Sequence, residues 1–233
     1  MDKRAVVLLS GGIDSTTCLA EAVETYGADN VLALSLYYGQ KHQKEIKHSN
    51  LVAAYYGVEH ITQEVSGAFD LSDCTLLKGR GEIVHESYAE QIKEGSVATY
   101  VPFRNGLFLS YAVAIALSVH AQAVYYGAHA DDAAGSAYPD CSVKFAHAMN
   151  AAIIEGTGGA VELRAPFIGC NKAEVVRRGL ALEAPYHLTW SCYEGGDHPC
   201  GKCGTCIDRL KAFEANGVAD PTFVYVSNEQ EVK

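Results

Sequence analysis

The chain has 233 residues, 48% of them hydrophobic and 20% charged, and its formal net charge is −10. This composition is that of a globular protein with one full core, and the acidic charge without a Lys/Arg cluster argues against nucleic acid as a partner. No apolar run is long enough to span a bilayer and no signal peptide is evident, so we expect a cytoplasmic protein without a membrane partner.

Apolar runs alternate with helical patterns along the chain. The predicted strands are Ala5–Leu9, Val31–Tyr38, Val58–Val65, Ala123–Tyr126 and Val161–Ala165. The predicted helices are Ser15–Tyr26, His42–Tyr56, Asn105–His120, Val143–Ile154, Lys172–Glu183 and Cys203–Ala215. The stretch Gly67–Gly95 is irregular and polar, and is long enough to be a lid or a partner contact.

The alternation of strand and helix predicts an α/β fold with a Rossmann-like parallel sheet and helices on both faces. The C-terminal part is rich in cysteine and reads as a small zinc-binding appendage. We therefore divide the chain into a nucleotide-binding domain, residues 1–185, and an appendage, residues 186–233.

A glycine-containing motif, Ser10-Gly11-Gly12-Ile13-Asp14-Ser15, separates the first strand from the first helix. Such a turn presents backbone N–H groups, and the helix directs its positive N-terminus to the same place, so the motif predicts a phosphate site. It is not a Walker A loop, because no Gly-Lys-Ser/Thr follows. Helix-capping Ser and Asp residues around a simple turn would be the plainer explanation.

Four of the eight cysteines lie close together, Cys192, Cys200, Cys203 and Cys206, and the last three form overlapping C-x-x-C units. Four thiolates suit a structural tetrahedral zinc ion with Zn–S bonds of roughly 2.3 Å. A disulfide is disfavoured in the cytoplasm, while a redox C-x-x-C or an iron–sulfur cluster remains open. Cys18, Cys74, Cys141 and Cys170 are scattered and read as small buried hydrophobes.

The Ser-Gly-Gly-x-Asp-Ser pattern resembles the pyrophosphate loop of the PP-loop ATP pyrophosphatases, which have an adenine nucleotide alpha hydrolase-like fold. Further stretches resemble one family within this group, the 7-cyano-7-deazaguanine synthases of queuosine biosynthesis, over nearly the whole chain. These stretches are Tyr37–His42, Val101–Asn105, Gly127–Asp132, Tyr138–Cys141, Ala165–Phe167 with Lys172, and Trp190–Gly196. Most of them follow strand ends, where ligands bind in an open α/β sheet.

The resemblance implies a ligase that uses ATP, Mg²⁺ and ammonia to convert 7-carboxy-7-deazaguanine into the nitrile (preQ0), through an adenylated carboxylate and an amide. The family's reaction is usually written with ADP and phosphate, which differs from an AMP-forming loop, and the residues leave this open. The ATP site implied is Leu9, Ser10, Gly11, Gly12, Ile13, Asp14, Ser15, Thr16, Thr17, Cys18 and Leu19. Candidate substrate or phosphate contacts are Gln40, Arg104, Asn105, Asp131, Asp132, Tyr138, Asp140 and Lys172.

Other roles are expectations of the same kind. Asp14 is a candidate ligand of Mg²⁺. His42 and His129 are candidate proton carriers, although a histidine at a strand end is as often structural. The chain has no room for a glutaminase domain, so free ammonia is the expected nitrogen source, and we expect a homodimer. Alternatives are a tRNA-modifying PP-loop ATP pyrophosphatase, an NAD or GMP synthetase-like ligase, and a zinc-bound nucleotide sensor without activity.

Overall fold

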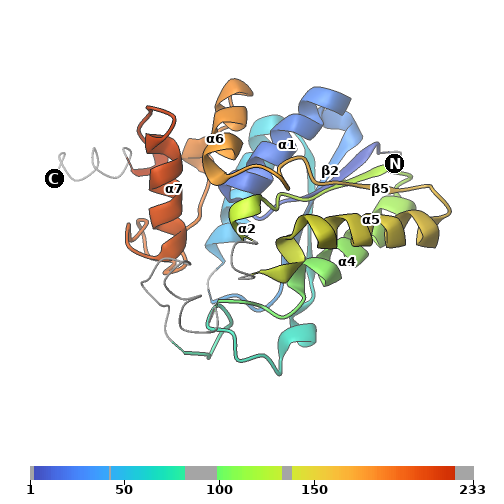
Figure 1. Ribbon diagram of the computed structural model, residues 1–233, viewed down its shortest axis with the longest axis horizontal. Coiled ribbons are helices and arrows are strands. Elements are labelled where there is room, and N and C mark those ends of the chain that lie inside the picture. The colour runs from blue at the N-terminus through green and yellow to red at the C-terminus, as the bar shows by residue number, and fades with distance from the viewer. Residues whose placement is uncertain (1–2, 42, 82–98, 133–137, 224–233) are drawn as a thin grey trace.

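A parallel sheet forms the centre of the computed structural model, which describes residues 3–41, 43–81, 99–132 and 138–223 (Figure 1). Hydrogen bonds join the strands in the order β3-β2-β1-β4-β5, and the pairings between them are parallel. The strands are β1 (Ala5–Leu8), β2 (Val31–Tyr37), β3 (Glu59–Glu64), β4 (Ala123–Tyr125) and β5 (Glu162–Arg164). The predicted Rossmann-like sheet is confirmed.

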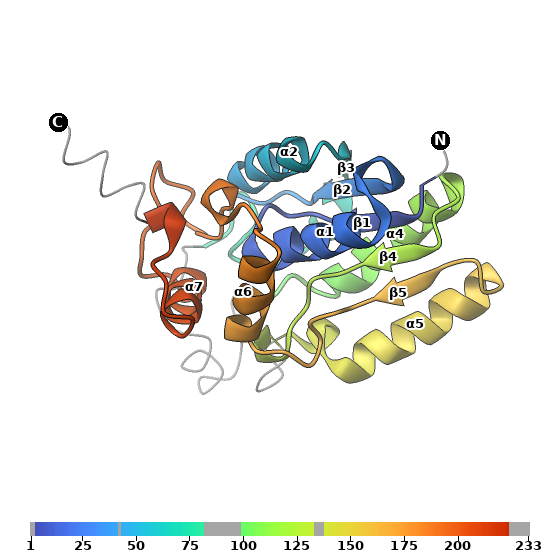
Figure 2. The ribbon, with the colours of Figure 1, turned by 90° about the horizontal axis from the view of Figure 1, so that it is seen from above.

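Helices cover both faces of this sheet (Figure 2). The helices are α1 (Ile13–Tyr26), α2 (Lys44–Tyr56), α4 (Arg104–Ser118), α5 (Val143–Thr157), α6 (Lys172–Ala181) and α7 (Gly204–Glu214). On one face, residues of α1, α2 and α6 form a core with alternate residues of β1. On the other face, α4 and α5 pack on the remaining strand positions. This coverage explains why β1 and β2 are nearly continuous apolar runs.

Capping residues account for where several helices begin and end. Ser142 accepts a hydrogen bond from the backbone of Phe145 at the start of α5. Asn171 and Glu174 form a capping box at the start of α6, which places Lys172 as the first residue of that helix. The helix α2 ends at Gly57, whose φ of +66° belongs to the left-handed region that glycine favours.

The predicted elements agree with the structure to within a few residues. The first helix starts at Ile13 and not at Ser15, because Gly12 is its N-cap. Of the predicted irregular stretch, residues 67–81 form turns and the end of a short 3₁₀ helix (Ser66–Phe69), while 82–95 lie outside the described residues. His42 also lies outside them. Among the described helices, none has both the length and the apolar character needed to cross a membrane.

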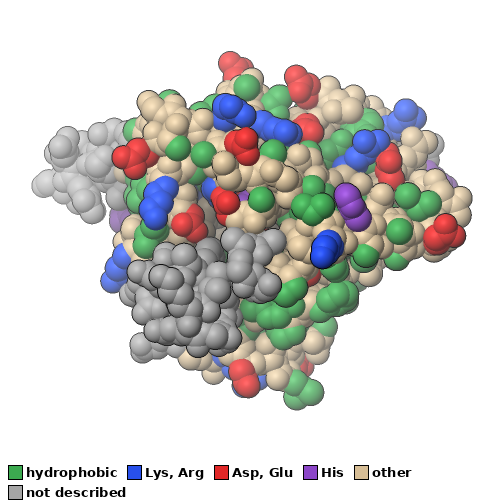
Figure 3. Space-filling model, in the orientation of Figure 1, with side chains coloured by type: hydrophobic (Ala, Val, Ile, Leu, Met, Phe, Trp, Pro, Cys, Tyr) green, Lys and Arg blue, Asp and Glu red, His purple; other side chains and the backbone are tan. Residues whose placement is uncertain are grey.

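The C-terminal segment packs against the rest of the molecule through α7, which lies beside α6 (Figure 2). Phe213 of α7 joins the core beneath α1 and contacts Tyr186 edge-to-face, with ring centroids 5.4 Å apart. The boundary at residues 185 and 186 stays a prediction. On the face shown in Figure 3, Lys and Arg side chains lie among Asp and Glu side chains.

The strand order reverses at β1, because β2 lies on one side of it and β4 on the other. The chain leaves β1 for α1 on one face, whereas α4 covers the opposite face. The carboxyl ends of β1 and β4 therefore open a crevice at the point where ligands bind in sheets of this kind. The loops after β1 and β4 lie at this crevice.

Candidate functional site

Ser10 and Ser15 hold the predicted phosphate loop closed. Their hydroxyl oxygens lie 3.0 Å apart, and Ser15 Oγ also accepts from the Ser10 backbone N–H at 3.2 Å and donates to the Gly12 carbonyl at 3.2 Å. The first amide groups of α1 have no carbonyl of the preceding turn to bind. The loop thus presents hydroxyls and backbone N–H groups at a helix N-terminus, the arrangement that binds phosphate.

Two glycines allow backbone segments to meet around this loop. Gly11 has a φ of +82°, and a Cβ there would lie 2.6 Å from the backbone nitrogen of Ser49 in α2. A Cβ at Gly127, after β4, would lie 3.0 Å from the Asp14 carbonyl carbon. A side chain at Gly11 would therefore overlap the backbone of α2, whereas one at Gly127 would press on the start of α1 and shift it by a few tenths of an ångström.

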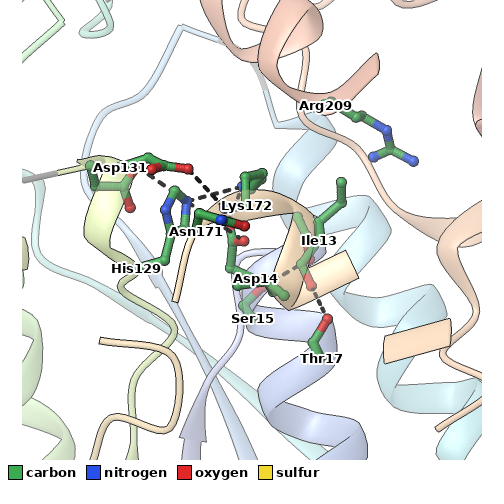
Figure 4. A network of polar contacts seen from close by, with 12 residues as sticks. Ile13, Asp14, Ser15, Thr17, His129, Asp131, Asn171, Lys172 and Arg209 are labelled. Carbon is green, nitrogen blue, oxygen red and sulfur yellow. Dashed lines mark hydrogen bonds and ion pairs between the residues drawn. The ribbon is translucent and has the colours of Figure 1, made fainter. Parts of the chain in front are cut away.

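An ion pair closes the loop on its other side (Figure 4). Lys172 Nζ, at the start of α6, lies 2.5 Å from Asp14 Oδ2 in the first turn of α1. Burial raises the pKa of the Asp14 carboxyl, but the Lys172 ammonium and then His129 outweigh it, so this pKa is lower than usual. Asp14 is thus ionised at neutral pH and holds the Lys172 ammonium beside the N-terminus of α1.

His129 lies between three charged side chains in the loop after β4. Its Nε2 atom is 3.3 Å from Asp132 Oδ1, 3.3 Å from Lys172 Nζ and 3.8 Å from Asp14 Oδ1. Burial raises the pKa of Asp132, and attraction to His129 and Lys172 offsets this in part. Among the described residues, neither Asp14 Oδ1 nor His129 Nδ1 has a hydrogen-bond partner, although both atoms are buried. A ligand can satisfy such atoms.

These groups line one cavity of about 240 Å³ at the carboxyl end of the sheet. It brings together most of the predicted site residues from all parts of the chain. Those that line it are Leu9, Ser10, Gly12, Ile13, Asp14, Ser15, Gln40, Arg104, Asn105, Asp132, Tyr138 and Lys172.

The remaining predicted residues lie outside the cavity lining, which is formed by described residues. They are Gly11, Thr16, Thr17, Cys18, Leu19, Asp131 and Asp140. Thr17 Oγ1 donates to the Ile13 carbonyl and lies 2.8 Å from the Tyr186 hydroxyl. The Asp131 carboxylate accepts from the Lys172 backbone and Asp140 from the Asn105 backbone, each at 2.8 Å (Asp131 in Figure 4). These two carboxylates position helix starts.

Another part of the cavity combines charge with aromatic rings. The Arg104 guanidinium, in the first turn of α4, lies 5.5 Å from the centre of the Tyr38 ring and 5.8 Å from that of Phe108. Glu45, in the first turn of α2, lines the same cavity. Sequence reasoning missed Glu45, because an acidic residue in the first turn of a helix is ordinary.

The cysteine cluster lies next to the cavity. The sulfur atoms of Cys192, Cys200, Cys203 and Cys206 all lie within 4.8 Å of one another, and three of these residues are buried. Backbone N–H groups donate to two of the sulfurs, from Cys200 to Cys192 and from Cys203 to Cys200, at 3.3 Å. The Cys203 and Cys206 thiols lower the pKa of Cys192. The cluster can bind a metal ion through four sulfurs, as the spacing predicts.

Segments near this cluster contribute to the cavity wall. Thr205 and Asp208 of α7 line it, together with Trp190 and Ser191. Asp208 and Thr205 were not predicted, because Thr205 is a variable position of the Cys203-x-x-Cys206 unit and Asp208 follows that unit without a motif of its own. The stretch Trp190–Gly196 was part of the family resemblance. Its Trp190 connects the cluster with the phosphate loop, because the backbone N–H donates to Gly11 and the indole N–H donates to the Cys192 carbonyl.

Arg209 fastens α7 to the segment that carries Trp190. Its guanidinium is 2% exposed and binds both carboxylate oxygens of Asp220, at 2.6 and 3.0 Å. It also donates to Thr189 Oγ1 at 2.8 Å and to Ser191 Oγ at 3.2 Å. All of these partners lie in the C-terminal quarter of the chain, so the clamp holds the cysteine cluster in register with the cavity.

Comparison with known proteins gives one consistent family. The model of the family described as queuosine biosynthesis protein QueC matches residues 4–217. A curated 7-cyano-7-deazaguanine synthase from Archaeoglobus fulgidus is 45% identical over 219 residues, 94% of this chain and 89% of that protein. Proteins of the same name from Caldicellulosiruptor saccharolyticus and Oceanobacillus iheyensis are 41% and 39% identical, over 94% of this chain and 94% and 97% of their own.

A solved structure has the same fold at low sequence identity. NMN synthetase from Francisella tularensis superposes with a TM-score of 0.53 and 17% identity, covering 93% of this chain and 78% of that one. Identity at this level concerns the fold alone, and the chemistry has to be argued from the residues of the cavity.

Proposed function

Because the chain belongs to the QueC family of queuosine biosynthesis proteins, we propose that it uses ATP and ammonia to convert 7-carboxy-7-deazaguanine into 7-cyano-7-deazaguanine. One observation of the geometry carries the proposal: the phosphate loop and the cationic and aromatic residues around Arg104 line a single cavity. A nucleotide and an anionic heterocycle can therefore meet in it. Membership of this family favours the deazaguanine synthase over the tRNA-modifying PP-loop ATP pyrophosphatase.

The first half of the reaction activates a carboxylate, which is a poor electrophile. A carboxylate oxygen attacks the α-phosphorus of ATP, the bond to the bridging oxygen breaks, and pyrophosphate leaves. Ammonia then attacks the acyl carbon, loses a proton, and displaces AMP, which keeps the carboxylate oxygen. The product of this half is an amide.

The second half removes the remaining oxygen. The amide oxygen attacks the α-phosphorus of a second ATP, and pyrophosphate leaves again. The nitrogen loses its two protons as the carbon–nitrogen triple bond forms, and AMP departs with the oxygen. Both oxygens of the original carboxylate end in AMP by this route.

Residues of this chain would stabilise the charges of both halves. The loop Ser10–Ser15 would hold the β- and γ-phosphates through its N–H groups and hydroxyls, and Lys172 would neutralise charge that grows on the departing pyrophosphate. Asp14 would keep Lys172 in place through the ion pair. Arg104 would bind the carboxylate of the substrate or a phosphate.

The cavity offers a fitting donor set for Mg²⁺. Asp14 Oδ1 is buried and has no hydrogen-bond partner among the described residues, and the Asp132 carboxylate lines the same cavity. Carboxylate oxygens are the ligands that this hard cation prefers, and bound Mg²⁺ would offset phosphate charge. We propose Asp14 and Asp132 as its protein ligands.

The metal of the cysteine cluster is proposed to be a single structural zinc ion, since four sulfur ligands leave no position for a substrate. A colourless protein with one zinc per chain is expected, whereas a brown protein with iron and sulfide would contradict this. The homodimer, the lack of a nucleic-acid partner and the cytoplasmic location also remain predictions.

The test of the function is direct. Purified protein is incubated with ATP, Mg²⁺, ammonium and 7-carboxy-7-deazaguanine, and the nitrile is measured by mass spectrometry. Asp14→Asn should lower the rate by about 10²-fold or more, because it removes the charge that holds Lys172. Asp29→Asn, an exposed carboxylate outside the cavity, is the matched control and should leave the rate unchanged. Folded, metal-loaded wild type that forms no nitrile would contradict the proposal.

A further inference from the structure

The Glu45 side chain occupies a place in the cavity that the reaction described above does not use. Glu45 lies in the first turn of α2, and its backbone is so close to the phosphate loop that a Cβ on Gly11 would lie 2.7 Å from its carbonyl oxygen. Its side chain lines the cavity with Tyr38 and Arg104. Glu45 and Arg104 both line the cavity, and the positive charge of the Arg104 guanidinium favours the ionised form of Glu45.

Within the described part of the chain, no hydrogen bond or ion pair holds the Glu45 carboxylate. Burial raises the pKa of Glu45, and the Arg104 guanidinium offsets only part of this effect. The Glu45 side chain is half-buried, and its carboxylate oxygens stay accessible from the cavity that the residue lines. A ligand that brings N–H groups to this position would satisfy it.

The two heterocycles of the reaction differ at the edge that such a carboxylate can bind. A deazaguanine presents two adjacent donors, its ring N1–H and its exocyclic amino group, which match the two oxygens of one carboxylate. Adenine presents one amino group beside an unprotonated ring nitrogen, whose lone pair would face the second oxygen. The chemistry of Glu45 therefore suits the deazaguanine and disfavours adenine.

We infer that Glu45 is the specificity-determining residue that binds the N1–H and 2-amino edge of the deazaguanine substrate. This inference rests on the proposed function and states which edge of the substrate the Glu45 side chain binds. The apolar rings of Tyr38 and Phe108, in the same cavity, supply surfaces against which a flat heterocycle packs.

Binding measurements test this without depending on turnover. The affinities of 7-carboxy-7-deazaguanine and of ATP are measured by calorimetry for wild type, Glu45→Gln and Glu45→Asp. Glu45→Gln should weaken binding of the deazaguanine by about 10- to 100-fold, because the deazaguanine loses its charge-assisted hydrogen bonds to the carboxylate. The affinity for ATP should stay within about twofold of wild type, because ATP makes no such bonds with Glu45. Glu45→Asp keeps the negative charge, so its affinity for the deazaguanine should lie between those of wild type and Glu45→Gln. Glu24→Gln, on the exposed side of α1, is the matched control.

A substrate analogue without the 2-amino group, 7-carboxy-7-deazahypoxanthine, provides a test on the intact protein. Wild type should bind it about 10-fold or more weakly than the substrate, and Glu45→Gln should lose most of this discrimination. Weaker ATP binding in Glu45→Gln, unchanged deazaguanine binding, or wild type that does not discriminate would each overturn the inference. Absence of nitrile from a wild type that binds the substrate through Glu45 would instead contradict the proposed function alone.

Discussion

The backbone N–H of Trp190 donates a hydrogen bond of 2.8 Å to the carbonyl oxygen of Gly11 in the phosphate loop. The indole Nε1–H of the same residue donates to the Cys192 carbonyl at 2.8 Å. The indole ring packs on the imidazole of His48 in α2, with ring centroids 5.3 Å apart. One buried tryptophan thus connects the loop, α2 and the cysteine cluster. Through it, the cysteine cluster supports the geometry of the phosphate loop.

Loss of the metal should therefore affect the nucleotide site as well as stability. Cys203→Ser should lose the metal, lower the thermal midpoint and weaken ATP binding, since Trp190 loses the support of Cys192. Cys170→Ser, at a half-buried cysteine outside the cluster, is the control and should keep its metal. Metal analysis, thermal unfolding and ATP calorimetry measure these effects. Metal-free protein with unchanged ATP affinity would show that the two sites are independent.

Removal of the Lys172 charge should change both the rate and its pH dependence. Lys172 is the main group that lowers the pKa of Asp14 against the effect of burial, so in Lys172→Met this pKa rises. The acid limb of the pH profile of kcat/KM should move to higher pH, and kcat/KM at neutral pH should fall about 10²- to 10³-fold. Lys172→Arg keeps the charge and should keep the limb in place. An acid limb that does not move in Lys172→Met would refute the role of this pair.

Glu45→Gln should make the ligand-free protein more stable at neutral pH. Burial raises the pKa of Glu45 in the folded state, so its ionised form is disfavoured there. Below the unfolded pKa of 4.5 both states are protonated and the variant should show no gain. The gain should grow as the pH rises through the folded pKa, and each kcal/mol corresponds to about 2–4 °C in Tm. Equal Tm values for variant and wild type across this range would contradict a raised pKa of Glu45 in the folded protein.

Arg209 should contribute strongly to stability, because its removal leaves the Asp220 carboxylate buried without its partner. Arg209→Met should lower the free energy of unfolding by about 3–5 kcal/mol, as for other broken buried ion pairs. Arg177→Met, whose side chain is 69% exposed, is the matched control and should change this free energy by less than about 0.5 kcal/mol. Urea unfolding measures both, and similar effects of the two substitutions would contradict the clamp.

The sequence predicts most of the fold, because its signals are local. Apolar runs mark β1 and β2, and glycines mark the ends of α1 and α2. The order of the strands is not local information, since nothing near β4 in the chain indicates that it pairs with β1. That order follows from the way helices pack on both faces, and it decides where the crevice lies.

The candidate site is predictable where a motif identifies it and not elsewhere. Asp14 and Lys172 were both predicted, although 158 positions separate them, and the structure joins them in one ion pair. Asp131 and Asp140 were predicted as substrate or phosphate contacts from the family resemblance. Their carboxylates accept backbone hydrogen bonds, and their contact with a ligand stays a prediction. Glu45 was missed, because only the tertiary packing around it distinguishes its carboxylate from that of an ordinary helix start.

The fate of the substrate oxygens tests the central claim, that the phosphate loop holds pyrophosphate while AMP is attached to the substrate. 7-Carboxy-7-deazaguanine labelled with ¹⁸O at both carboxylate positions is converted with ATP and ammonium, and the nucleotide and phosphate products are analysed by mass spectrometry. Label recovered in AMP, with pyrophosphate formed alongside, is the result that this account predicts. Label recovered in inorganic phosphate, with ADP as the nucleotide product, would contradict it.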